Sequence, residues 1–144
     1  MFSTKGRYAL RAMIDIAKNQ NDQYVTIKDI SKREEISIKY LEQVISLMVK
    51  AGFLISLRGN NGGYRLSVNP KSITAGDILR AAEGTIAPIQ CISMGRNVCP
   101  RKTECSTLPF WTGLNGVLNK YVDSYTLDDL VNQSTSYEAD NYSI

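Results

Sequence analysis

The sequence predicts a mainly α-helical fold with one small β-hairpin, arranged as a winged helix-turn-helix domain plus a long dimerisation helix. Three patterns support this prediction. A stripe from Leu41 to Met48 has the spacing of one helix face. A Gly-rich hairpin follows it over residues 53–68. A second apolar stripe starts at Trp111 and covers about 17 residues, or roughly 25 Å of helix.

Composition indicates an ordinary soluble chain. It has 144 residues, with 43% hydrophobic and 22% charged residues, as is typical of a globular domain. No apolar run approaches the roughly 20 residues of a membrane span, and the N-terminus lacks the apolar segment of a secretory signal. We therefore expect a cytoplasmic location without a membrane partner, where thiols stay reduced.

Three helices are predicted in the first 52 residues, each preceded by a side chain that can cap it. The caps are Ser3 or Thr4, Thr26 and Ser37, and the helices end near Lys18, Glu34 and Gly52. Strands are expected at 53–57 and 64–68, with Arg58 to Gly63 between them. A hairpin directly after a helix-turn-helix forms a wing, and a capping box at Thr74 starts a fourth helix. Residues 1–84 thus form the predicted first domain.

The rest of the chain divides into three predicted segments. Residues 85–106 lack periodicity and form a loop that contains every cysteine of the protein. Residues 107–132 form the long helix, with Pro109 in its first turn, and a short C-terminal helix. Residues 133–144 are polar and are expected to form a flexible tail.

The basic charge of the first half favours a nucleic-acid partner. Residues 1–70 carry 11 Lys and Arg against 6 Asp and Glu, whereas residues 71–144 carry 6 against 8. A helix fits the DNA major groove, and the outer face of the third helix presents Lys39, Tyr40, Glu42 and Gln43. Arg58 and Gly59 at the wing suit a minor groove, and Lys5, Arg7 and Lys28 suit phosphates. The alternative is a solvated face beside a plain hairpin.

The cysteines are spaced C-x7-C-x5-C at Cys91, Cys99 and Cys105, and the chain has no histidine. Cysteines on one irregular loop can bind an iron–sulfur cluster, although three are one short of a full set. Nearby Arg96, Arg101 and Lys102 favour the thiolate. Zinc would need an oxygen ligand, a thiol–disulfide switch needs only two cysteines, and incidental thiols are the fourth interpretation.

The long helix has an apolar stripe that includes Trp111, Leu114, Leu118 and Tyr121. It can pack on its own domain or on a second copy of the chain. Helix-turn-helix proteins usually bind DNA as two-fold dimers, so we expect a homodimer interface there, with Trp111 as its anchor.

The segments STKGRYAL, ISIKYLEQ and RGNNGGYRL, with the cysteine spacing before a Trp-containing helix, resemble the Rrf-type winged-helix regulators over about residues 2–132. That family includes iron–sulfur, nitric-oxide and cysteine-metabolism regulators (IscR, NsrR and CymR). The resemblance implies a dimeric bacterial transcription factor with crossed long helices. It places Lys39, Tyr40, Glu42 and Gln43 on the recognition helix, and Arg58 and Gly59 on the wing.

The resemblance also implies that Cys91, Cys99 and Cys105 ligate a cluster, either 2Fe-2S or 4Fe-4S. Two features depart from the family. The IscR-type histidine corresponds to Leu108, and the acidic NsrR-type ligand of the first helix falls at Arg7. Candidates for the fourth ligand are Glu104, Ser106, Asp15 or a small thiol.

The sequence therefore predicts a dimeric regulator, of repressor type, that binds pseudo-palindromic double-stranded DNA. A cluster on the cysteine loop would sense iron–sulfur status, redox state or nitric oxide. The alternative is a metal-free thiol–disulfide switch that binds DNA. A metal-bound structural adaptor is a different class and predicts no salt-dependent DNA binding. An enzyme is not expected, because the chain has no histidine, no phosphate-binding loop and no paired nucleophile and base.

Overall fold

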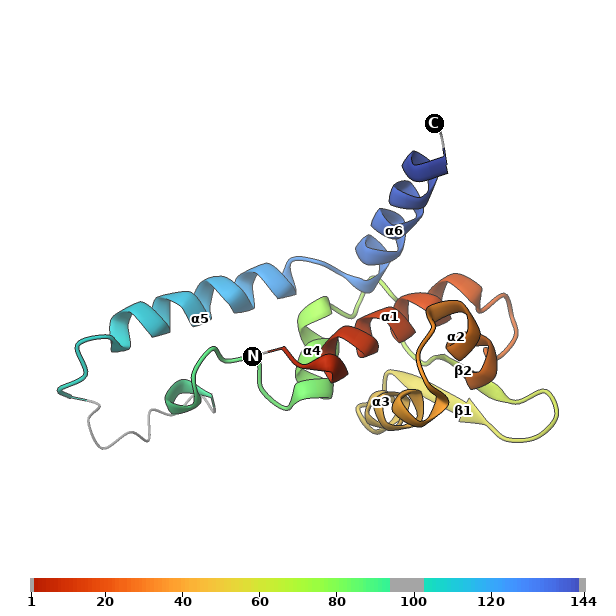
Figure 1. Ribbon diagram of the computed structural model, residues 1–144, viewed down its shortest axis with the longest axis horizontal. Helices are drawn as coiled ribbons and strands as arrows, with labels where there is room; N and C mark the ends of the chain where they lie inside the picture. The colour runs from red at the N-terminus through yellow and green to blue at the C-terminus, as the bar shows by residue number, and fades with distance from the viewer. Residues whose placement is uncertain (1, 94–102, 143–144) are drawn as a thin grey trace.

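The structure is a computed structural model that describes residues 2–93 and 103–142. Six α-helices and one antiparallel hairpin form this part of the chain (Figure 1). The helices are α1 Thr4–Asn19, α2 Ile27–Glu34, α3 Ile38–Lys50, α4 Ala75–Glu83, α5 Leu108–Asp123 and α6 Leu127–Tyr142. The strands are β1 Leu54–Leu57 and β2 Gly63–Leu66. The predicted fold class is confirmed.

The first three helices start where their capping residues predict. Each cap side chain accepts a hydrogen bond from a backbone N–H two or three residues later: Lys5 to Ser3, Asp29 to Thr26 and Tyr40 to Ser37. A cap of this kind typically stabilises a helix by about 1 kcal/mol. The starts of these helices are therefore set by local chemistry.

Helix α1 lies at the centre of the domain. It contacts α2, α3, α4, α6 and β2, and its buried side chains meet the predicted apolar stripe of α3. The core residues of these two helices are at most 1% exposed: Ala9, Ala12, Met13 and Ile16 from α1, and Leu41, Val44, Ile45 and Met48 from α3. Complete burial stabilises each of the larger side chains by about 2 kcal/mol.

The hairpin is fastened to the domain by a third extended segment. β1 and β2 pair from Leu54 opposite Leu66 to Leu57 opposite Gly63. Val25, between α1 and α2, exchanges two backbone hydrogen bonds of 2.8 Å with Tyr64. A Cβ atom at Gly63 would lie 2.4 Å from the Val25 carbonyl oxygen, so this approach requires glycine. The strands that carry the loop of residues 58–62 are thus held firmly to the domain.

The chain returns to this domain after α5. Backbone hydrogen bonds of 2.8 Å join the Ala75 N–H to Tyr125 and the Leu127 N–H to Ile73. Leu127 is fully buried in the same core as α1 and α3. The start of α6 therefore belongs to the core of the first domain, in addition to residues 1–84.

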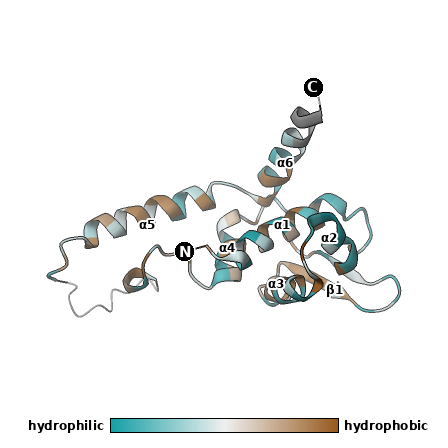
Figure 2. Cartoon of the chain, in the orientation of Figure 1, coloured by the Kyte–Doolittle hydropathy of each residue, from teal (hydrophilic) through white to brown (hydrophobic). Residues whose placement is uncertain are grey.

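Helix α5 projects away from the domain, and its C-terminal end packs near α4 (Figure 1). Val122 is buried there with Leu79 and Ile86. Farther along the helix, Phe110, Leu114, Val117 and Tyr121 share one face and are 40–68% exposed. Figure 2 shows apolar residues along the projecting helix. No helix in the described ranges is long and apolar enough to cross a membrane.

Two boundaries differ from the sequence prediction. The expected short C-terminal helix is longer, because α6 extends to Tyr142 and residues 133–142 are helical. The hydroxyls of Ser134 and Thr135 donate to the Val131 carbonyl, one turn earlier, so polar residues are accommodated within the helix. In the predicted loop 85–106, residues Gln90–Ile92 form a 3-10 turn.

An ion pair between a buried carboxylate and a partly exposed guanidinium joins α1 to α2. The Asp15 side chain is 2% exposed and accepts hydrogen bonds of 2.9 and 2.8 Å from Nε and Nη2 of Arg33. These bonds raise the pKa of Arg33 above its ordinary value, against the lowering effect of partial burial. Arg33 therefore stays charged over the whole physiological pH range.

The Arg33→Ala variant should be destabilised by about 3 kcal/mol, because it leaves a buried carboxylate without its cation. Urea unfolding measures this change. Lys32→Ala, at the exposed neighbouring position, is the control and should change stability by less than about 0.5 kcal/mol. Equal stability of both variants would contradict the role given to the pair.

Candidate nucleic-acid interface and cysteine loop

The outer face of α3 presents the polar side chains that the sequence analysis assigns to DNA. Lys39, Tyr40, Glu42 and Gln43 are all exposed, while the opposite stripe of the helix is buried against α1. Burial of that stripe fixes the rotation of α3 about its axis. The four polar side chains are therefore directed to solvent from its first two turns.

Two residues that the sequence analysis missed hold the start of α3 against α1. The Tyr8 ring meets the Tyr40 ring edge to face at a centroid distance of 6.0 Å. Arg11 lies 5.7 Å from the centroid of the Tyr8 ring, and its Nε atom is 3.2 Å from a carboxylate oxygen of Glu34 at the end of α2. Tyr8 and Arg11 are spaced i, i+3 on the exposed side of a predicted helix, which was the available signal.

The wing loop carries its predicted residues at the far end of the hairpin. Arg58 and Gly59 directly follow β1 and are exposed. Gly59 has a φ of 110°, a conformation that favours glycine, and its carbonyl accepts a 3.0 Å hydrogen bond from the Gly62 N–H. The loop is thus a closed turn with an arginine at its entrance.

The other predicted cations lie on helix starts. Lys5 and Arg7 are exposed in the first two turns of α1, and Lys28 is exposed in the first turn of α2. The Tyr8–Tyr40 contact brings the first turns of α1 beside the first turn of α3. The structure therefore groups Lys5 and Arg7 with the outer face of α3, while Arg58 is carried separately by the wing.

The cysteine loop connects α4 to α5. Cys91 lies in the 3-10 turn and Cys105 precedes α5, and both are half-buried. The Cys105 Sγ atom is 3.5 Å from the Thr107 hydroxyl. Cys99, Arg96, Arg101 and Lys102 lie outside the described residues. Within the described ranges, no three His, Cys, Asp or Glu side chains gather into a metal-binding group.

The donor set fits an iron–sulfur cluster only in part. Three thiols are suitable ligands, and the described portion supplies two of them from the ends of one loop. Asp15, a candidate fourth ligand, is buried with both carboxylate oxygens bonded to Arg33, so it is not available. Glu104 and Ser106 flank Cys105 and are exposed, while Leu108 starts α5.

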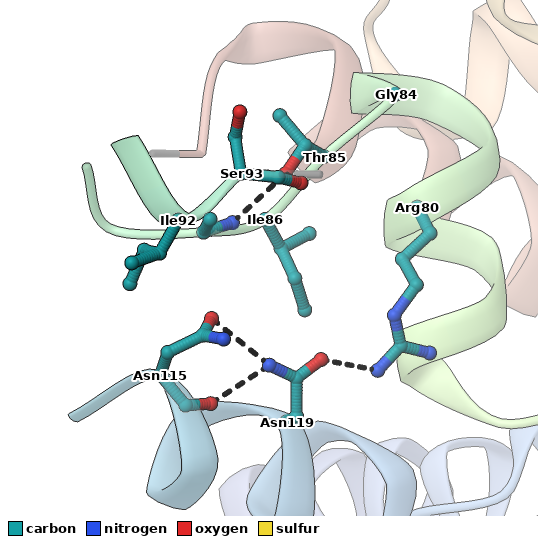
Figure 3. Close-up of a pocket in the computed structure, with 9 residues that line it drawn as sticks. Arg80, Gly84, Thr85, Ile86, Ile92, Ser93, Asn115 and Asn119 are labelled. Atoms are coloured by element: carbon teal, nitrogen blue, oxygen red, sulfur yellow. Dashed lines mark hydrogen bonds between the residues drawn. The ribbon is translucent and has the colours of Figure 1, made fainter. Parts of the chain in front are cut away.

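A polar network underlies the base of the cysteine loop, around a pocket of about 220 Å³ (Figure 3). Arg80 of α4 donates to Asp123 at 2.9 Å and to Asn119 at 2.7 Å. Asn119 in turn donates to Asn115, one turn earlier in α5. Arg80 holds the pKa of the Asp123 carboxyl below its ordinary value, so the α4–α5 ion pair persists at neutral pH.

A separate hydrogen bond closes the base of the loop beside the end of α4. The Thr85 hydroxyl, just after the end of α4, donates to the Ser93 carbonyl at 3.0 Å. Ile86 and Ile92 form the apolar wall of the pocket. Because Ile86 also packs with Leu79 of α4 and Val122 of α5, the base of the cysteine loop is attached both to α4 and to the projecting helix.

Comparison with known proteins agrees with this arrangement. The Rrf2 family model, described as an iron-dependent transcriptional regulator, matches residues 2–133. Protein rrf2 of Nitratidesulfovibrio vulgaris is 36% identical over 133 residues, which cover 92% of this chain and 88% of that protein. The transcriptional regulator IscR of Pectobacterium atrosepticum is 37% identical over 130 residues, which cover 90% and 78%.

Solved structures show the same fold. CymR, the global cysteine regulator of B. subtilis, has a TM-score of 0.74 and 38% identity, over 92% of this chain and 97% of that one. The oxidized form of Staphylococcus aureus CymR has a TM-score of 0.69 and 33% identity, over 91% and 95%. IscR and CymR are regulators and not enzymes. The chain belongs to the Rrf2 family of transcriptional regulators.

Proposed function

We propose that this regulator binds pseudo-palindromic double-stranded DNA as a homodimer in the cytoplasm, acts as a repressor, and senses its signal through the cysteine loop. The observation that supports DNA binding most strongly is the exposed outer face of α3, held by Tyr8 and followed by an anchored wing. Membership of a regulator family gives independent support.

The proposed contacts follow from side-chain chemistry. The first turns of α3 enter the major groove, where Lys39 and Gln43 donate to base edges and Glu42 accepts from a cytosine amino group. Arg58 enters the adjacent minor groove, where Gly59 allows the backbone to approach closely. Lys5, Arg7 and Lys28 bind phosphates, which orient the domain without reading sequence.

Helix α5 supplies the proposed dimer interface. Its exposed apolar face contains the predicted Leu114 and Tyr121, together with Phe110 and Val117, while the predicted Trp111 and Leu118 are half-buried beside it. The Phe110 and Trp111 rings meet at 5.1 Å. A second copy that covers this face would remove it from water and place two recognition helices about one turn of DNA apart.

Arg58→Ala should weaken DNA binding about tenfold, because it removes the minor-groove cation. Fluorescence anisotropy with a duplex selected from a random library measures the dissociation constant. The control is Lys71→Ala, at an exposed position between β2 and α4, which should retain wild-type affinity. Equal affinity of Arg58→Ala and wild type would remove the wing from the interface.

The sensing role rests on Cys91, Cys99 and Cys105. Three thiols in one loop are suited to an iron–sulfur cluster, and the family is described as iron-dependent transcriptional regulators. When bound, a cluster would supply chemistry that responds to iron supply, oxidants and nitric oxide. The chain links the cysteine loop to the helices on both sides. Thr85, just after the end of α4, donates a hydrogen bond to the Ser93 carbonyl in the loop, and Cys105 lies three residues before α5. A change in loop conformation therefore acts on both α4 and α5.

A metal-free thiol–disulfide switch is the second candidate. One observation favours it: the similar S. aureus CymR has been solved in an oxidized form. Two cysteines suffice for this chemistry, and no three His, Cys, Asp or Glu side chains gather into a metal-binding group in the described part of the chain. The loop would then change its conformation when a pair of its thiols is oxidised to a disulfide by an external oxidant.

One experiment separates these candidates. Protein purified without oxygen should contain iron and acid-labile sulfide and absorb visible light, and Cys91→Ser should lose all three because a thiolate ligand is gone. Ser93→Ala, at a non-ligating position in the same turn, is the matched control. Absence of iron and sulfide, with a reversible disulfide under mild oxidant, would overturn the cluster in favour of the switch.

A further inference from the structure

One carboxylate outside the predicted interface joins the end of α4 to the start of α1. Glu83, the last residue of α4, accepts hydrogen bonds from the Ser3 N–H at 2.7 Å and from the Gly6 N–H at 2.9 Å. Its two oxygens also lie 2.8 and 2.9 Å from the Ser3 hydroxyl. These contacts span about 80 residues of sequence.

This arrangement gives the free backbone N–H groups at the start of α1 two different acceptors. The Ser3 hydroxyl accepts from the Lys5 N–H and directs its own proton to Glu83. A negative charge at a helix N-terminus is also stabilised by the exposed N–H groups and the helix dipole. The first turn of α1 is therefore held by both its own cap and a carboxylate from α4.

The approach of the two helices depends on Gly6. A Cβ atom at this position would lie 2.6 Å from a Glu83 carboxylate oxygen and 3.1 Å from a Leu79 methyl group. The absence of a side chain thus lets the carboxylate reach the backbone of α1. The contact therefore requires both Gly6 of α1 and Glu83 of α4.

Glu83 is charged at neutral pH. Partial burial acts to raise its pKa, but the hydrogen bonds from Ser3 and Gly6 outweigh that effect and hold the pKa below its ordinary value. A lowered pKa stabilises the fold above the ordinary range of a glutamate, and this contribution is lost as pH falls through the folded-state pKa. The contact is therefore complete at physiological pH.

The opposite side of the same turn faces the proposed DNA surface. Tyr8 follows Gly6 by two residues, about 200° around the helix, and its ring meets Tyr40 at the start of α3. Lys5 and Arg7 flank Tyr8 on the helix surface and are both exposed. The first turns of α1 thus lie between Glu83 on one side and the recognition helix on the other.

We propose that Glu83 is a positioning residue that holds Lys5 and Arg7 where they meet two DNA phosphates beside α3. This proposal rests on the DNA-binding function proposed above. Glu83 does not itself touch DNA: its oxygens are bonded to α1, and a carboxylate would repel phosphate. It acts by fixing the position of the first two turns of α1 relative to α4.

The test is the salt dependence of DNA binding. Each phosphate neutralised by a cation contributes about 0.9 to the slope of log affinity against log salt. Because the proposed homodimer presents two such pairs of cations, Glu83→Ala should lower the magnitude of this slope by about 2 to 4, as should the double variant Lys5→Ala with Arg7→Ala. Combining all three changes should lower it no further. Glu83→Gln retains one oxygen for the Ser3 and Gly6 N–H groups and should keep most of the slope.

A matched variant separates positioning from simple loss of stability. Asp129→Ala removes a carboxylate that accepts from the Thr126 N–H at 2.9 Å and caps α6 in a similar way, far along the chain from α1. It should leave the slope unchanged. The probe is a selected duplex of about 30 base pairs, long enough for two half-sites, at a temperature where circular dichroism shows all variants folded.

The outcomes distinguish the two proposals. If wild-type protein shows no salt-dependent binding to the selected duplex, DNA binding itself fails. If the wild type binds and Glu83→Ala keeps the wild-type slope, the positioning role of Glu83 is overturned while the proposed interface stands.

Discussion

The packing of α1 is the constraint on which the rest of the structure depends. Its apolar side buries Met13 and Ile16 against the stripe of α3, its Asp15 pairs with Arg33 of α2, and its first turn is held by Glu83 of α4. The packing of α1 therefore sets the relative positions of α3, of the first turn with Lys5 and Arg7, and of the end of α4 from which the cysteine loop starts.

Local chemistry made much of the fold predictable. Ser3, Thr26, Ser37 and Thr74 each cap the helix that the sequence assigns to them, because capping involves residues only two or three positions apart. The buried stripe of α3 follows from its spacing in the same way. The apolar stripe of α5 was also predictable from its spacing, with Val117 beside it, and the structure adds Phe110 to the exposed face.

Long-range contacts were not predictable from those patterns. Nothing in a single sequence pairs Glu83 with Ser3, Tyr8 with Tyr40, or Arg33 with Asp15, because each contact arises only after the helices pack. Asp15 shows the consequence for the candidate site. The sequence alone made its carboxylate a candidate cluster ligand, whereas in the fold both carboxylate oxygens accept hydrogen bonds from Arg33. The length of α6 was missed because its later residues lack an apolar stripe.

We propose that two copies of this chain, joined through α5, present their two α3 helices to one DNA duplex, each held in place by α1. Hydroxyl-radical footprinting on a selected duplex measures this arrangement. Two equivalent protected regions are expected, related by two-fold symmetry and centred about one helical turn apart, or a multiple of it. A single protected region without a symmetric counterpart would rule out the dimeric complex.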